Sequence, residues 1–291
     1  MSLAIAYLRL TKPRVTALVI MTSVTGYFWA SPSTFWNPEL LFLVAGVVLS
    51  CSGAATLNQY LEYRLDARMQ HTVSRPIPAG MVQSVHALAF GVVLILSGVI
   101  LLYAKINLIT AFLSLLSAVI YVVIYTPMKQ RSWLSTSVGA VSGALPPVIG
   151  WTAVSGTVDY RAWIFFLILF IWQHPHFYAI AWMYRSDYRS VGFKVLSAID
   201  TGGKKTFRHI FVYSMVLVPV SLLPWVLGMS GVWYGAGALA FGTILAIFST
   251  RLFISQTDKN ARQLFNATIA YLPALLIFIV LDNANTANLW R

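Results

Sequence analysis

Long apolar runs, each close to the length of a membrane-spanning helix, alternate with short polar segments along most of the chain. About 20 consecutive apolar residues cross a bilayer as a helix, so this pattern predicts a polytopic all-α membrane protein. Short breaks at 105–107 and 228–231 predict tight helical hairpins. The nine spans that we expect lie near residues 15–31, 39–60, 84–104, 107–126, 134–154, 162–183, 208–228, 232–251 and 265–282.

The composition of the chain supports this interpretation and argues against several other classes of protein. The 291 residues are 58% hydrophobic and 10% charged, with a mean hydropathy of +0.75, which excludes an ordinary soluble domain and favours one membrane domain over 1–291. The net charge of +12 does not indicate nucleic-acid binding, because the basic residues are scattered among apolar spans. Cys51 is the only cysteine, which excludes an intramolecular disulfide and a thiolate metal site.

The distribution of lysine and arginine predicts the orientation of the chain. If the N-terminus is cytoplasmic, 17 of the 20 basic residues fall on the cytoplasmic side, and only Lys105, Arg161 and Arg291 fall on the other. Such a bias is typical of inner-membrane proteins and also supports nine spans, since one helix more or fewer would scramble it.

The most polar segment begins at the end of the second span. Asn58, Glu62 and Asp66 are spaced four residues apart, so their oxygen-bearing side chains share one helical face about 12 Å long. Three hard oxygen ligands suit Mg²⁺, which is commonly completed by phosphate oxygens. The alternative is a solvated helix end with ion pairs, but charge at a membrane exit is costly without a role.

A second acid, Asp187, follows the sixth span. Four spans separate it from Asp66, and an even number returns the chain to the same membrane face. We therefore expect Asp66 and Asp187 to approach each other. The loop 184–207 that carries Asp187 is either a mobile lid or a solvated connector.

Basic residues cluster on this same side and form our candidate contacts for a phosphate group. For Lys129 and Arg131, orientation of the helix is an equally good explanation. The full set of candidates is Arg14, Arg64, Arg68, Arg75, Lys129, Arg131 and Arg185.

The fifth and sixth spans carry polar and helix-breaking residues. In the fifth, Gly143, Gly150 and the pair Pro146 and Pro147 indicate close packing and an interrupted helix where a cavity can form. In the sixth, His174 and His176 flank Pro175. Each histidine either bonds a neighbouring helix or contacts the iron or carboxylates of a substrate, and Trp172 is grouped with them.

Together these segments resemble one family, the UbiA-type intramembrane prenyltransferases, over residues 8–282. The acid motif with Arg68, Met69, Thr72, Arg75 and Pro76 is similar to the first aspartate-rich motif of that family. The haem-farnesylating branch is indicated by four further segments and by Asp187-Tyr188. The four are Leu10-Thr-Lys-Pro-Arg-Val15, Tyr125-Thr-Pro127, Gly143-Ala-Leu-Pro-Pro-Val-Ile-Gly-Trp151 and Trp172-Gln-His-Pro-His-Phe177.

The resemblance implies nine helices around a central cavity, with Mg²⁺ as cofactor and with farnesyl diphosphate and haem B as substrates. It places metal and diphosphate roles on Asn58, Glu62, Asp66 and Asp187. Trp172, His174 and His176 are the candidate haem contacts. Two residues depart from the family pattern: Glu62 stands where aspartate is usual, and Ser186 stands where many members have an acid.

The compact length and the absence of an evident presequence favour a particular setting for the protein. We expect a bacterial cytoplasmic membrane with the active site facing the cytoplasm, and a haem A synthase or a terminal oxidase assembly as further partners. Two alternatives stay open. One is a sister prenyltransferase acting on an aromatic acid or a chlorin, and the other is a haem or lipid transporter or binding protein.

Overall fold

We describe the fold from a computed structural model covering residues 2–30 and 37–289, the side chains of 283–289 excepted. Every regular element in these residues is helical, which confirms the predicted fold class. The elements are α1 (Leu3–Leu10), α2 (Pro13–Ala30), α3 (Pro38–Asp66), α4 (Ser84–Lys105), α5 (Leu108–Val119), the π-helix η1 (Ile120–Tyr125), α6 (Thr126–Met128), α7 (Ser135–Ser155), α8 (Tyr160–Met183), α9 (Arg185–Ser190), α10 (Leu196–Ile199), α11 (Lys204–Val226), α12 (Val232–Ser255) and α13 (Asp258–Leu289).

Eight of the nine predicted spans correspond to helices long and apolar enough to cross a membrane in the described part of the chain. The exception is 15–31, which falls on the 18-residue α2, with residue 31 outside the described residues. Polar side chains within α2 lower its hydropathy, and Thr22, Ser23 and Thr25 are buried inside the bundle. Ser23 donates to the Pro146 carbonyl across the α2–α7 contact, so this polarity is satisfied by packing. The count of nine is therefore not fully confirmed.

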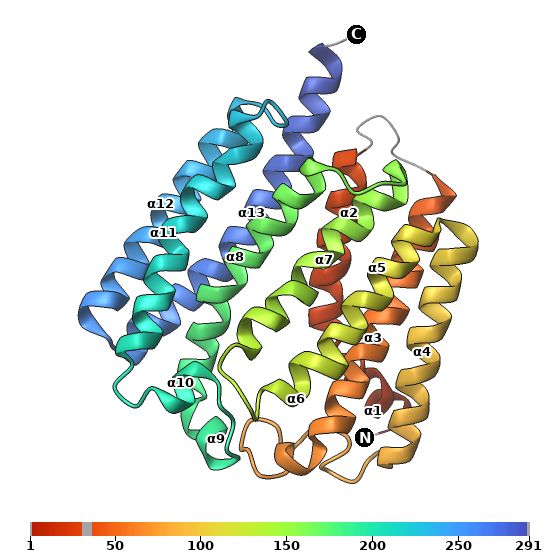
Figure 1. Cartoon of the computed structure of the whole chain (residues 1–291), viewed down its shortest axis with the longest axis vertical. Coiled ribbons are helices and arrows are strands. Elements are labelled where there is room, and N and C mark those ends of the chain that lie inside the picture. The colour runs from red at the N-terminus through yellow and green to blue at the C-terminus, as the bar shows by residue number, and fades with distance from the viewer. Residues whose placement is uncertain (1, 31–36, 290–291) are drawn as a thin grey trace.

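The long helices form a single bundle in which helices adjacent in sequence also pack together (Figure 1). On one side α2, α3, α4, α5 and α7 pack together, and on the other α8, α11, α12 and α13 do so. The two groups meet where α7 contacts α8 and α2 contacts α13. Both predicted hairpins are confirmed, since α4 ends at Lys105 before α5, and α11 ends at Val226 before α12. The cytoplasmic location of the N-terminus stays a prediction, and Arg291 lies outside the described residues.

Two glycines allow α2 and α7 to approach closely. A Cβ atom at Gly26 would collide with the Pro147 carbonyl oxygen, and one at Gly150 would collide with the Ser23 carbonyl oxygen. Pro146 has no N–H to donate within α7. The Ser142 carbonyl, four residues earlier, instead accepts a bond from the Ser117 hydroxyl at 3.0 Å. Thus the glycines serve packing, and α5 satisfies a backbone group that proline leaves free.

The fourth span is not a uniform α-helix. After α5 the chain widens into η1, over Ile120–Tyr125, and then continues as the short α6. Proline clashes with the carbonyl four residues before it in a regular α-helix, and π-turns are one way to relieve such crowding. The position of Pro127, two residues after the end of η1, agrees with that cause.

The glycine contacts between α2 and α7 predict a large loss of stability on a small change. Gly26→Ala and Gly150→Ala should each destabilise the protein by about 3 kcal/mol, because backbone atoms must move apart to admit a methyl group. Thermal unfolding of the purified protein in detergent measures this. Gly202→Ala is the matched control, because its added Cβ would meet no atom within 4 Å, and it should leave the unfolding temperature nearly unchanged. Equal unfolding temperatures for all three variants would contradict the packing argument.

Candidate functional site

The acid motif forms one buried face at the end of α3. Because α3 continues unbroken to Asp66, the side chains of Asn58, Glu62 and Asp66 lie on the same side of one helix, as predicted. They are 1%, 4% and 0% exposed, respectively. The alternative of a solvated helix end is therefore wrong, since water does not reach these groups. We call Asn58, Glu62 and Asp66 the acid face.

Each member of the acid face is paired with a cation from another segment. The Lys129 ammonium lies 2.8 Å from Glu62 Oε1, and the Arg75 guanidinium lies 2.7 Å from Asp66 Oδ2. The Lys12 ammonium donates to Asn58 Oδ1 at 2.9 Å. Burial acts to lower the pKa of Lys129, but the charge and hydrogen bond of Glu62, together with Tyr121 and Tyr188, raise that pKa overall. Buried carboxylates need such partners, because an isolated buried charge is strongly unfavourable.

Lys12 is a member of the site that the sequence did not identify. It has a φ of 48°, in the left-handed region that side chains other than glycine rarely adopt, and Pro13 follows it. This backbone turn between α1 and α2 directs the side chain onto Asn58. Burial, followed by the charges of Arg75 and Lys129, lowers the pKa of Lys12 to about 7. In the sequence Lys12 belongs to the segment Leu10–Val15 that carries the family resemblance, but nothing there indicates a contact with Asn58.

Asp187 lies beside the loop that follows α3. Its Oδ2 accepts a hydrogen bond from the His71 backbone N–H at 3.2 Å and a second from the His71 ring. The His71 ring stacks on Tyr184 with centroids 4.4 Å apart. The hydrogen bond from the His71 ring is the main reason that the pKa of Asp187 is lowered. The structure thus brings the exits of α3 and α8 together, and His71 is a contact that the sequence did not predict.

The oxygens of the acid face have the chemistry of a site for a hard cation. Among the described residues, no three His, Cys, Asp or Glu side chains are grouped closely enough to hold a metal ion. Asp66 Oδ1 is nevertheless buried without a hydrogen-bond partner in the part of the chain that the structure describes. An unpartnered carboxylate oxygen on the same face as the Asn58 amide and the Glu62 carboxylate fits Mg²⁺.

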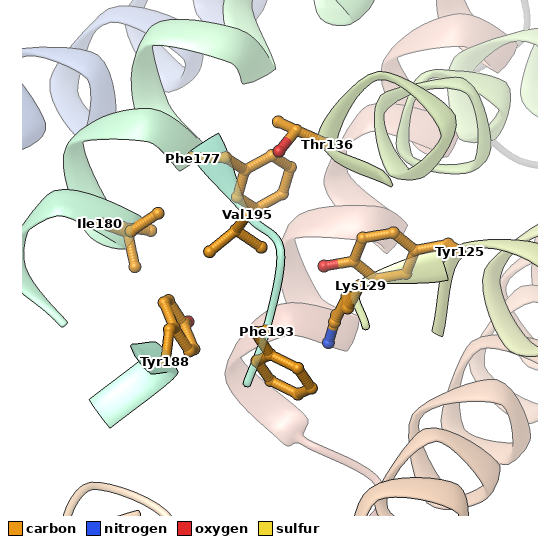
Figure 2. Close-up of a pocket in the computed structure, with 9 residues that line it drawn as sticks. Tyr125, Lys129, Thr136, Phe177, Ile180, Tyr188, Phe193 and Val195 are labelled. Atoms are coloured by element: carbon orange, nitrogen blue, oxygen red, sulfur yellow. The ribbon is translucent and has the colours of Figure 1, made fainter. Parts of the chain in front are cut away.

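A small cavity of about 70 Å³ adjoins the acid face (Figure 2). Figure 2 shows side chains from three parts of the chain around it, including Lys129, whose ammonium also pairs with Glu62. The walls combine aromatic and aliphatic groups with this single ammonium, an arrangement that suits an apolar chain with an anionic head. The lining residues are Tyr125, Lys129, Thr136, Phe177, Ile180, Ala181, Tyr188, Phe193 and Val195.

The loop 184–207 contains α9 and α10 and is held against the loop after α3. Met69 is 2% exposed and packs in a cluster with Val191, Phe193, Val195 and Ala198. Of the two interpretations of this loop, a solvated connector is wrong for these buried residues. Its role as a lid stays a prediction.

Of the predicted phosphate contacts, only Lys129 and Arg75 touch the acid face in the described structure. Arg185 pairs with Asp258 at 3.2 Å, Arg68 donates to the Ser190 carbonyl at 3.1 Å, and Arg64 donates to the Tyr63 hydroxyl at 3.0 Å. Arg14 and Arg131 are exposed. Roles for these five arginines at a phosphate group stay predictions.

The two histidines of α8 differ in how many of their ring nitrogens make hydrogen bonds. His174 is fully buried, with Nδ1 on the Phe170 carbonyl and Nε2 on the Ser137 hydroxyl, so both nitrogens are engaged. His176 bonds through Nδ1 to Thr268 Oγ1 at 2.8 Å, and Trp172 donates to the Thr268 carbonyl. The Thr268 hydroxyl donates to the Phe265 carbonyl, so it must accept from His176 Nδ1. His176 Nε2 is then the unprotonated nitrogen.

The sequence is similar over almost its full length to a group of curated proteins. The profile of the UbiA prenyltransferase family matches residues 19–277. Proteins named "Protoheme IX farnesyltransferase" from Solibacter usitatus (strain Ellin6076) and Opitutus terrae (strain DSM 11246 / JCM 15787 / PB90-1) are each 41% identical to this chain. The matches cover 95% of this chain and 98% and 94% of those proteins, respectively.

Solved structures with much lower identity share the fold. A digeranylgeranylglyceryl phosphate synthase superposes with a TM-score of 0.82 at 17% identity, covering 98% of this chain and all of that one. A UbiA homologue from Archaeoglobus fulgidus bound to GPP and Mg²⁺ gives a TM-score of 0.68 at 13% identity, covering 94% and 99%. At these identities the likeness establishes the arrangement of helices alone.

The Lys129–Glu62 pair predicts a measurable coupling. Lys129→Met should destabilise the protein by about 3 kcal/mol, because it leaves the Glu62 carboxylate buried without its countercharge. Adding Glu62→Gln to this variant should recover most of that loss, since the buried charge is then gone. Thermal unfolding in detergent measures both variants. Arg131→Gln is the control at an exposed cation nearby, and a loss as large as that of Lys129→Met would show that the ion pair is not the cause.

Proposed function

The chain belongs to the UbiA prenyltransferase family, and on that premise we propose that it transfers the farnesyl group of farnesyl diphosphate to a vinyl group of haem B. The products are haem O and diphosphate. One observation carries the prenyl-transfer part of this proposal: Lys129 both lines the cavity and pairs with the acid face. The haem acceptor is supported by the curated relatives, which are named for that substrate and are 35–41% identical.

The cations of the site suit a diphosphate. Arg75 and Lys129 pair with the carboxylates Asp66 and Glu62, and Lys12 donates to the neutral Asn58 amide, so the acid face has three basic neighbours for two carboxylates. This surplus of positive charge favours an anion, and the guanidinium of Arg75 can bind phosphate oxygens in a forked geometry. Asn58, Glu62, Asp66 and Asp187 are the residues that would hold Mg²⁺, which neutralises the charge of the departing diphosphate when bound.

The apolar walls protect the reactive end of the prenyl chain. As the carbon–oxygen bond of the allylic ester breaks, the diphosphate leaves with the electron pair and the first prenyl carbon becomes cationic. Tyr125, Phe177 and Tyr188 line the adjoining cavity and keep bulk water away from this carbon. A haem vinyl group then forms the new carbon–carbon bond, and one water molecule adds to the resulting cation and loses a proton to give the hydroxyethylfarnesyl substituent.

For the acceptor, we assign the haem contacts to α8. Trp172 and His176 stack with ring centroids 4.9 Å apart, and His176 keeps Nε2 free as an acceptor or ligand. His174 is a weaker candidate, because both of its nitrogens are already bonded.

We place this reaction at the cytoplasmic face of a bacterial inner membrane. The bias of lysine and arginine supports this orientation, and the eight long apolar helices make the protein an integral membrane protein. A haem A synthase or a terminal oxidase assembly is the class of partner that would receive the product.

An assay with labelled farnesyl diphosphate and haem B separates this proposal from its alternatives. The purified protein should convert haem B to a farnesylated product. EDTA should stop this conversion, because without a divalent cation the negative charge that develops on the leaving diphosphate is not neutralised. Transfer of label to an aromatic acid or a chlorin, but not to haem B, would favour a sister prenyltransferase. Binding of haem B with no transfer under any metal condition would favour a transporter or binding protein.

Removing either predicted acid should stop turnover while leaving the fold intact. Asp66→Asn and Asp187→Asn should each lower the rate of haem O formation by more than about 100-fold at fixed Mg²⁺. Product is measured by chromatography of extracted haem, with membrane insertion confirmed separately.

Asp159→Asn is the control, since Asp159 caps α8 by accepting from the backbone N–H groups of Arg161 and Ala162, and asparagine caps equally well. Near-normal rates for Asp66→Asn or Asp187→Asn would remove that residue from the proposed site.

A further inference from the structure

Thr126 lies between the π-helix η1 and the acid face, and its hydroxyl makes two contacts. Thr126 Oγ1 is 2.8 Å from the Tyr121 carbonyl oxygen and 3.1 Å from Asn58 Nδ2. A carbonyl oxygen only accepts hydrogen bonds, so the hydroxyl hydrogen is directed to Tyr121. The remaining contact must then run from the Asn58 NH₂ group to the lone pair of Thr126 Oγ1.

This direction of bonding fixes the orientation of the Asn58 amide. Its NH₂ group donates to Thr126 Oγ1 and to Glu62 Oε2, both at 3.1 Å. Its carbonyl oxygen is thereby turned to the opposite side, where the Lys12 ammonium donates to it at 2.9 Å. The two ends of an amide have nearly the same shape, so a flipped Asn58 would fit the space equally well. A flip would, however, place NH₂ against ammonium and would present no oxygen to a cation.

We propose that Thr126 is a positioning residue that holds Asn58 with its carbonyl oxygen, rather than its NH₂ group, presented to the cation bound at the acid face. The inference rests on the proposed function for the identity of that cation, a divalent metal. Thr126 would thus act on the metal only through Asn58, without being a ligand. Glu62 supports the same orientation but is itself a predicted ligand, whereas Thr126 is free to serve as a fixed acceptor.

The π-turn explains how the hydroxyl of Thr126 is held in place beside Asn58. The Tyr121 carbonyl accepts from the Thr126 backbone N–H, five residues on, as well as from the Thr126 hydroxyl. In a regular α-helix that carbonyl would bond the N–H of residue 125. Gly139 of α7 gives the widened turn room, because a Cβ atom there would lie 2.8 Å from the Tyr125 ring. The hydroxyl of Thr126 is consequently held from two sides, and the residue as a whole is 2% exposed.

Binding of Mn²⁺ in the presence of inorganic pyrophosphate, followed by electron paramagnetic resonance on the purified protein, tests this role without haem or turnover. Thr126→Val keeps the shape of the side chain and removes its acceptor, so Mn²⁺ binding should weaken about tenfold. Thr126→Ser keeps the hydroxyl and should bind within about twofold of the wild-type protein. Should Thr126→Val fail to fold, Thr126→Ala removes the same acceptor without adding a methyl group.

The second arm separates positioning from a structural effect. A carboxylate has two equivalent oxygens and needs no orientation, so in an Asn58→Asp background Thr126→Val should change Mn²⁺ binding by less than about twofold. An equal loss in both backgrounds, normal binding by Thr126→Val, or no Mn²⁺ binding by the wild-type protein would each overturn the inference. Absence of haem farnesylation, with the Mn²⁺ pattern as expected, would instead overturn the proposed acceptor and leave the role of Thr126 standing.

Discussion

The burial of two carboxylates at the end of a membrane helix is the constraint on which the rest of this structure depends. Glu62 and Asp66 are nearly inaccessible to water, and an ionised carboxylate in such a place is strongly unfavourable without a countercharge. Lys129 and Arg75 supply those charges from two different loops. The end of α3, the segment 67–83 that follows it and the end of α6 are therefore tied to one another through side chains.

A second set of contacts joins this cluster to the far half of the bundle. His71 bonds Asp187 in α9, and Met69 packs among Val191, Phe193 and other residues of the same loop. The backbone of Lys129 also accepts a hydrogen bond from the Lys194 N–H at 2.7 Å. Since α9 follows α8, the acid exits of the two halves are held together by apolar packing as well as by charge. The cavity beside Lys129 lies between these halves, so any movement of the loop 184–207 changes its walls.

Much of the fold followed from the sequence, because a bilayer imposes a simple length rule on apolar segments. Eight spans, both hairpins and the common face of Asn58, Glu62 and Asp66 depend only on hydropathy and helical periodicity. The first span was harder to classify, because α2 hides its polar side chains in contacts with other helices. Periodicity alone gives no sign of such contacts.

The parts of the site that the sequence did not reveal are those set by backbone geometry. Lys12 reaches Asn58 through a left-handed turn, and Thr126 reaches it through a π-turn, and neither conformation follows from residue type. In both cases the visible signal was a proline at the next position, Pro13 or Pro127. Proline restricts the residue before it and disturbs the preceding turn, so a polar residue directly before proline near a membrane exit is a feature to examine in other sequences.

In the proposed function, the ion pairs that stabilise the protein without a ligand would have to be exchanged for contacts with the diphosphate. Lys12, Arg75 and Lys129 each contact the acid face directly, so a diphosphate can recruit them only by competing with Asn58, Asp66 and Glu62. Asn58, Glu62 and Asp66 would hold a divalent cation that would serve as their countercharge, and Lys12, Arg75 and Lys129 would then be able to contact phosphate oxygens. Metal and diphosphate would then favour each other's binding through a shared set of charges. In the proposed function, the third basic residue of the cluster would supply positive charge for the anion.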